Sequence, residues 1–120
     1  MSLILDHTIV PACDREVSAQ FFSKIFGLSY TPSGGRFAAV RVNDTLTLDF
    51  DTRDTFESHH LAFKVDDATF DAIFSRIEAE GVVYGSGPEF LSDMKINHRR
   101  GGRGCYFRDP NRHILEILTA

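Results

Sequence analysis

Two histidines and one glutamate stand out because their types and spacing suit a metal site. His7 lies in the apolar run LILDHTIVP, His60 lies in HHLAFKV, and Glu116 interrupts the strand-like segment HILEILT. Two imidazoles and one carboxylate are a ligand set that leaves coordination positions open for water or substrate. A metal held in this way can bind two neighbouring oxygens of a substrate and stabilise the negative charge that develops on them.

The two histidines open two copies of one pattern, offset by 53 residues. Seven residues after each histidine comes an aspartate, and a helical stretch that ends near a glycine follows it. We therefore expect a duplicated unit, which can bring both histidines to one pseudo-two-fold axis. The corresponding residues are His7 and His60, Asp14 and Asp67, and Gly27 and Gly81.

Glu116 is a carboxylate among apolar residues, so we expect it to have a polar or charged partner. Strand alternation places it on one face with Ile114 and Leu118. A carboxylate in such company is costly to bury unless a cation, hydrogen bonds or a metal compensates it. A metal would be such a partner, and a salt bridge to a core arginine is the structural alternative. His7 has a similar apolar setting.

His59 competes with His60 for the position equivalent to His7. Strand alternation would place His59 on one face with Leu61, and His60 on the other face with Ala62. Periodicity alone favours neither histidine.

The apolar periodicity predicts the element order β-α-β-β-β, twice over. Asp14 is a suitable N-cap for the first helix, Asp66 or Asp67 for the second, and Asn43-Asp44 is typical of a tight turn. We expect strands at residues 3–10, 37–42, 45–50, 59–66, 82–84, 104–108 and 113–119.

Length, charge and cysteine content exclude several classes of protein. A chain of 120 residues suits one domain, and a net charge of −4 argues against nucleic-acid binding. Cys13 and Cys105 form no metal-binding or disulfide pattern. The sequence contains no apolar run of membrane-spanning length and no leader pattern, so we expect a cytoplasmic protein with no membrane partner.

Three segments together resemble one known superfamily. They are LDHTIVPACD at the start, SHHLAFKVDD in the middle and GCYFRDPNRHILEIL at the end. With these segments the chain resembles single-domain members of the vicinal oxygen chelate superfamily, the group of glyoxalases, bleomycin-resistance proteins and ring-cleaving dioxygenases. The resemblance implies one α+β domain over residues 1–120. Two βαβββ modules, at about 3–52 and 58–119, would curl into a cup around a metal.

The resemblance also implies the ligands and the assembly. The family pattern places the ligand two residues before the small residue Ala62, which selects His60 over His59. The implied metal ligands are His7, His60 and Glu116, with Glu116 also catalytic. Asp49 is the candidate fourth ligand or an outward polar residue. One divalent transition metal per site is implied, of the group Zn, Ni, Mn or Fe, in a homodimer whose sites are often built from both chains.

A basic stretch in this acidic chain is the candidate substrate contact. Arg99, Arg100 and Arg103 cluster with His98 inside the glycine-rich segment 85–102 and its flank, which we expect to be a loop or lid. These residues would hold an anionic small-molecule substrate or form a solvated loop. In fosfomycin-resistance members a tyrosine at the place of Tyr106 lines the pocket, and the alternative is that its ring only packs.

The turn before the last strand has one unusual residue. Many relatives carry glycine where this chain has Arg112, so a left-handed backbone there would cost about 1 kcal/mol or more. His113 is expected to be a turn residue rather than a catalyst.

The leading functional hypothesis is a metal-dependent glyoxalase-like enzyme, either a lyase or isomerase, a thiol transferase, or a dioxygenase. The second is a metal-free dimer of the bleomycin-resistance type that binds a drug or another ligand. A third is a regulatory or structural dimer with a vestigial site. A ligand-binding dimer predicts binding with no turnover and no metal requirement, whereas an enzyme predicts loss of activity when the metal is chelated.

Overall fold

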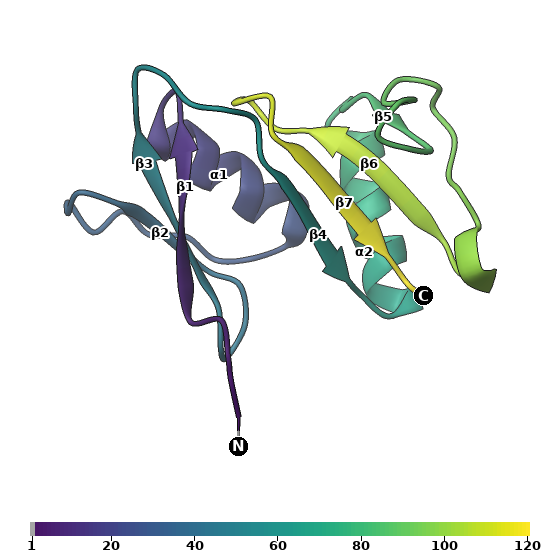
Figure 1. Cartoon of the computed structure of the whole chain (residues 1–120), viewed down its shortest axis with the longest axis horizontal. Helices are drawn as coiled ribbons and strands as arrows, with labels where there is room; N and C mark the ends of the chain where they lie inside the picture. Colours follow the sequence, from purple (N-terminus) through teal and green to yellow (C-terminus); the bar gives the residue numbers. More distant parts are fainter. Residues whose placement is uncertain (1) are drawn as a thin grey trace. The chain divides into compact units, whose positions relative to one another are not determined.

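The computed structural model describes residues 2–120, and the chain divides between Glu57 and Ser58 into two compact units (Figure 1). The first unit contains β1 (His7–Ala12), α1 (Arg15–Phe26), β2 (Ala38–Arg41) and β3 (Thr47–Thr52). The second contains β4 (His60–Lys64), α2 (Asp67–Ala79), β5 (Tyr84–Gly85), a 3₁₀ turn (Arg99–Gly101), β6 (Gly104–Arg108) and β7 (Ile114–Leu118).

In the first unit, α1 is defined by its two ends. The side chain of Asp14 accepts hydrogen bonds from the backbone N–H groups of Glu16 and Val17, and Gly27 ends the helix with φ of 70°. The helix buries Phe22, whose ring lies 6.0 Å from that of Phe50 on β3. Its sheet has the order β1-β3-β2, with β1 parallel and β2 antiparallel to β3.

The second unit follows the same plan with one more strand. The side chain of Asp66, rather than Asp67, caps α2 by accepting from the backbone N–H of Thr69. The helix buries Phe70, Ile73 and Ile77. Its sheet has the order β4-β7-β6-β5, with β4 parallel to β7.

The predicted α+β class and the repeated modules are confirmed. The parallel pair β1 and β3 in one unit corresponds to β4 and β7 in the other. Among the described residues, the first unit has no assigned strand between α1 and β2, where the second unit has the two-residue β5. Within residues 2–120, neither α1 nor α2 is long and apolar enough to cross a membrane.

The first strand begins later than the sequence predicts. It starts at His7 instead of residue 3, because its partner β3 begins opposite His7 at Thr47. Leu3 and Ile4 therefore have no strand partner in this unit, and their relative exposures are 93% and 59%. A period-two apolar pattern without a partner does not make a strand.

The turn between β6 and β7 joins the two strands tightly and aligns β4 with them. Asp109 accepts hydrogen bonds through Oδ1 from the backbone N–H groups of Asn111 and His113. The fully buried His113 accepts through Nδ1 from the backbone N–H of His59, at 2.8 Å. His113 thus joins the turn to the start of β4, in the structural role expected for it.

Arg112 has φ of 68°, the left-handed conformation anticipated at this position. Replacing it by glycine should increase the free energy of unfolding by about 0.5–1 kcal/mol, because the relief of backbone strain exceeds the entropy cost of glycine. Its carbonyl, which accepts from Ser58 and Arg108, is retained in this variant. Urea unfolding of Arg112→Gly and Arg112→Ala measures the effect, and an equal gain in both variants would contradict this explanation.

Candidate functional site

Each unit places one histidine and one carboxylate on the same face of its sheet. In the second unit Ala62 pairs with Glu116, and His60 lies two residues before Ala62. In the first unit Ile9 pairs with Asp49, and His7 lies two residues before Ile9. Register partners and residues two apart along a strand share a face. The duplication therefore repeats a histidine and carboxylate pair.

His60 and Glu116 lie in direct contact in the second unit. Nε2 of His60 is 3.0 Å from Oε1 of Glu116, and the Glu116 side chain is only 13% exposed. The side chain that contacts the Glu116 carboxylate on β4 is thus a histidine and not the core arginine considered as the alternative. His59 instead donates its backbone N–H to His113, and the rings of these two histidines lie 5.0 Å apart.

Tyr106 extends this pair onto a third strand. It is the register partner of Glu116 on β6, and its ring lies 5.8 Å from that of His60. Burial raises the pKa of Tyr106, hydrogen bonding to Glu116 and the charge of that carboxylate raise it further, and Arg99 lowers it. Nη1 of Arg99 donates to the Tyr106 hydroxyl at 3.0 Å, so the phenol keeps its own proton for the carboxylate.

A cavity of about 250 Å³ lies beside Tyr106 and Glu116. The three arginines of the basic stretch reach it, whereas His98 does not line it. The C-terminal residues of the chain form part of its wall. The lining residues are Asn97, Arg99, Arg100, Arg103, Tyr106, Glu116, Leu118 and Ala120.

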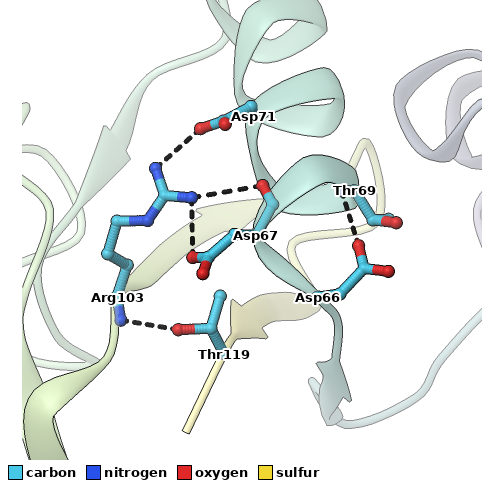
Figure 2. A network of polar contacts seen from close by, with 6 residues as sticks. All are labelled: Asp66, Asp67, Thr69, Asp71, Arg103 and Thr119. Carbon is cyan, nitrogen blue, oxygen red and sulfur yellow. Dashed lines mark hydrogen bonds and ion pairs between the residues drawn. The ribbon is translucent and has the colours of Figure 1, made fainter.

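Arg103 differs from the other two arginines because its charge is already paired (Figure 2). Its guanidinium donates to Asp71 at 2.7 Å and to the carboxylate of Asp67 at 3.0 Å. The same group lies 4.4 Å from the centre of the Phe70 ring. Its backbone N–H donates to Thr119. Arg103 therefore ties α2 to the end of β7.

The first unit holds His7 beside a carboxylate that the sequence analysis did not single out. Nδ1 of His7 lies 2.8 Å from Oδ2 of Asp6, and both side chains are well exposed. This hydrogen bond and the charge of Asp6 raise the pKa of His7 above its ordinary value, and Asp49 adds to the increase. An interaction at Nδ1 leaves Nε2 as the ring nitrogen for a metal.

Asn97 is a second residue that sequence reasoning missed. Its amide nitrogen donates to the carbonyl of Ser86, its amide oxygen accepts from the backbone of Arg99, and its backbone pairs with Gly104. It thereby holds the basic stretch over the cavity. In the sequence this contact leaves one trace, the glycine at position 104. The structure leaves no room for a side chain there, because a Cβ would lie 2.7 Å from the Asn97 amide.

The expected ligands are thus divided between the units. His60 and Glu116 belong to the second, and His7 and Asp49 belong to the first. Residues 2–120 include no group of three histidine, cysteine or carboxylate side chains that could hold a metal ion. The proximity of His60 and Glu116 is therefore the geometric core of the candidate site.

Comparison with known proteins gives the same fold. The chain is 43% identical to the oxidase ChaP-H2, with a TM-score of 0.93, over 100% of this chain and 95% of that one. It is 41% identical to the oxidase ChaP-H1, with a TM-score of 0.91, over 99% and 97% of the two chains. It is also 24% identical to the metallothiol transferase FosB of Shouchella clausii, over 96% of this chain and 79% of that protein.

The two modules and these likenesses define an α+β protein of the glyoxalase and dioxygenase class. The chain belongs to the vicinal oxygen chelate superfamily. No family model matches it.

The contact between Gly104 and Asn97 can be tested by adding one methyl group. Gly104→Ala should lower the free energy of unfolding by about 1–3 kcal/mol, because hydrogen bonds prevent the Asn97 amide from moving aside. Urea unfolding measures the change. Gly35→Ala is the control, because its Cβ would meet only Ser33 at 3.7 Å. Equal stability of the two variants would contradict the close approach at Asn97.

Proposed function

We propose that the chain is a divalent-metal-dependent enzyme that acts on a small substrate with two neighbouring oxygens. The observation that supports this most strongly is the 3.0 Å separation of His60 Nε2 and Glu116 Oε1 on adjacent strands. Donors that bind one metal at about 2.1 Å each lie about 3 Å apart, so this pair suits two positions of one coordination sphere. The equivalent pair in the first unit supports His7 as a third ligand.

The donor set favours a borderline metal. Imidazole nitrogen and carboxylate oxygen without thiolate suit Zn, Ni, Mn or Fe. His7 would be the third ligand, with Asp49 as a fourth or as a water-mediated contact because its side chain is one methylene shorter than glutamate. We also propose a homodimer, in which the first unit of either chain would provide His7.

Residues of the chain would transfer protons and form hydrogen bonds with the substrate. A bound divalent cation would act as a Lewis acid toward the substrate oxygens. Glu116 can take a proton from the substrate and return it, because its carboxylate is largely buried and close to both His60 and Tyr106. Tyr106 can donate its hydroxyl proton in a hydrogen bond to Glu116 or to a substrate oxygen, while Arg99 holds the hydroxyl in place.

The type of reaction can first be tested by measuring whether the enzyme consumes oxygen. Two relatives that match almost the whole chain are named as oxidases, and the more distant FosB is named as a metallothiol transferase. A chain of this length, with two modules, is therefore compatible with an oxidase. We propose oxygen-dependent oxidation as the first reaction to assay, with thiol transfer and lyase chemistry as the next.

Metal binding provides the test of the site. Wild-type protein should bind about one metal per chain, and His60→Ala, Glu116→Gln and His7→Ala should each weaken binding by at least about 100-fold, because each removes a ligand atom. Elemental analysis and calorimetric titration with Mn, Fe, Ni and Zn measure this. Removal of metal by a chelator should also abolish oxygen consumption.

His59→Ala is the matched control, because it removes the neighbouring imidazole while leaving the contact of His60 with Glu116. Its metal affinity should remain close to that of wild type. If His59→Ala and His60→Ala lose metal equally, the ligand assignment is wrong. If wild-type protein binds no metal, the proposal fails in favour of a metal-free ligand-binding protein.

A further inference from the structure

We propose that the cavity beside Glu116 is a subsite for a substrate carboxylate, with Arg99 and Arg100 as its cationic groups. This inference rests on the proposed function and narrows its substrate to an organic acid that also presents two neighbouring oxygens. The charge of the cavity wall, the contacts of its arginines and the cavity volume support this proposal.

The charge of the cavity wall is unbalanced. Arg103 is paired with Asp67 and Asp71. Glu116 brings one negative charge to the wall, because its contact with His60 cancels that charge only when the histidine is protonated. Within the described part of the chain, neither Arg99 nor Arg100 has an ion pair with a carboxylate. Two guanidinium groups without an ion pair and one carboxylate therefore line the cavity, which leaves a net positive charge to attract an anion.

Arg99 is held in place by neutral partners. Nη1 donates to the Tyr106 hydroxyl at 3.0 Å, and Nη2 approaches the carbonyl of Ser86 at 3.5 Å. These partners orient the planar group without neutralising its charge. A guanidinium presents paired N–H donors that match the two oxygens of a carboxylate, which favours this group over a neutral amide.

Arg100 occupies a backbone conformation that rarely suits a residue with a side chain. Its φ is 55° and its ψ is 27°, and Gly101 follows with φ of 77°. Strained non-glycine residues of this kind cluster at binding sites. Together with its place in the cavity wall, this conformation supports a ligand-directed role for its side chain.

The size of the cavity indicates which part of the substrate it receives. A volume of about 250 Å³ is below the usual range of about 300–1,000 Å³ for whole ligand pockets, so it suits one end of a substrate. Leu118 and Ala120 add apolar side chains to a lining that is otherwise mostly polar. An aromatic acid could place its ring beside these two residues and its carboxylate toward the arginines, with the neighbouring oxygens toward Glu116.

Benzoate and benzamide are matched probes for this subsite, because they share a ring and differ in charge. Titration of metal-free full-length protein, followed by the ¹⁵N–Hε resonances of its arginines, should show saturable benzoate binding. Benzamide should bind about 10-fold more weakly, as expected when a hydrogen bond to a charged group is lost. Arg100→Gln and Arg99→Gln should each weaken benzoate binding by about 5-fold or more.

Arg41→Gln controls for the change in net charge. Arg41 is an exposed arginine of β2 that does not line the cavity, so its loss should leave benzoate affinity within about 2-fold of wild type. The subsite is overturned if benzoate does not saturate, if benzamide binds equally well, or if Arg41→Gln weakens binding as much as Arg100→Gln does.

The two proposals fail separately. His7→Ala should lose metal and keep benzoate binding, because His7 does not line the cavity. Benzoate binding in a protein that never takes up metal would support the subsite and overturn the metal-dependent function. Metal binding without any preference for benzoate over benzamide would overturn the subsite and leave the metal site standing.

Discussion

The parallel register between β4 and β7 is the constraint on which the candidate site depends. It pairs Ala62 with Glu116, and this pairing brings His60, two residues earlier on the same face, into contact with the carboxylate. The turn at Asp109–His113 secures this register, because buried His113 accepts from the backbone of His59. A slip of one residue would turn His60 to the other face and separate the two groups.

The sequence was sufficient for the repeated plan, because periodicity and caps are local signals. Asp14 and Gly27 bound the first helix as predicted. Periodicity could not tell which of His59 and His60 contacts Glu116, because that contact joins residues 56 positions apart. The late start of β1 at His7 likewise depends on where its partner strand begins. Long-range contacts therefore decide what local patterns leave open.

The basic stretch illustrates the same limit for charge. In the sequence Arg99, Arg100 and Arg103 are equivalent, but Asp67 and Asp71, 36 and 32 residues before Arg103, pair with that arginine alone. Arg99 instead rests against a neutral phenol. Of these neighbouring arginines, one is bound to two carboxylates of α2, and the other two form no ion pair with a carboxylate in the described part of the chain. The full ligand set, with His7 and Asp49 from the other unit, stays a prediction.

The place of the last residues has a practical meaning for anyone handling this protein. Leu118 and Ala120 line the cavity, and a Cβ at Gly102 would lie 2.5 Å from that of Ala120. An affinity tag fused after Ala120 would therefore leave the fold at the rim of the cavity and compete with small molecules for that space. The same position suits a small fluorine-labelled reporter, which would sense occupancy of the cavity without alteration of any polar group.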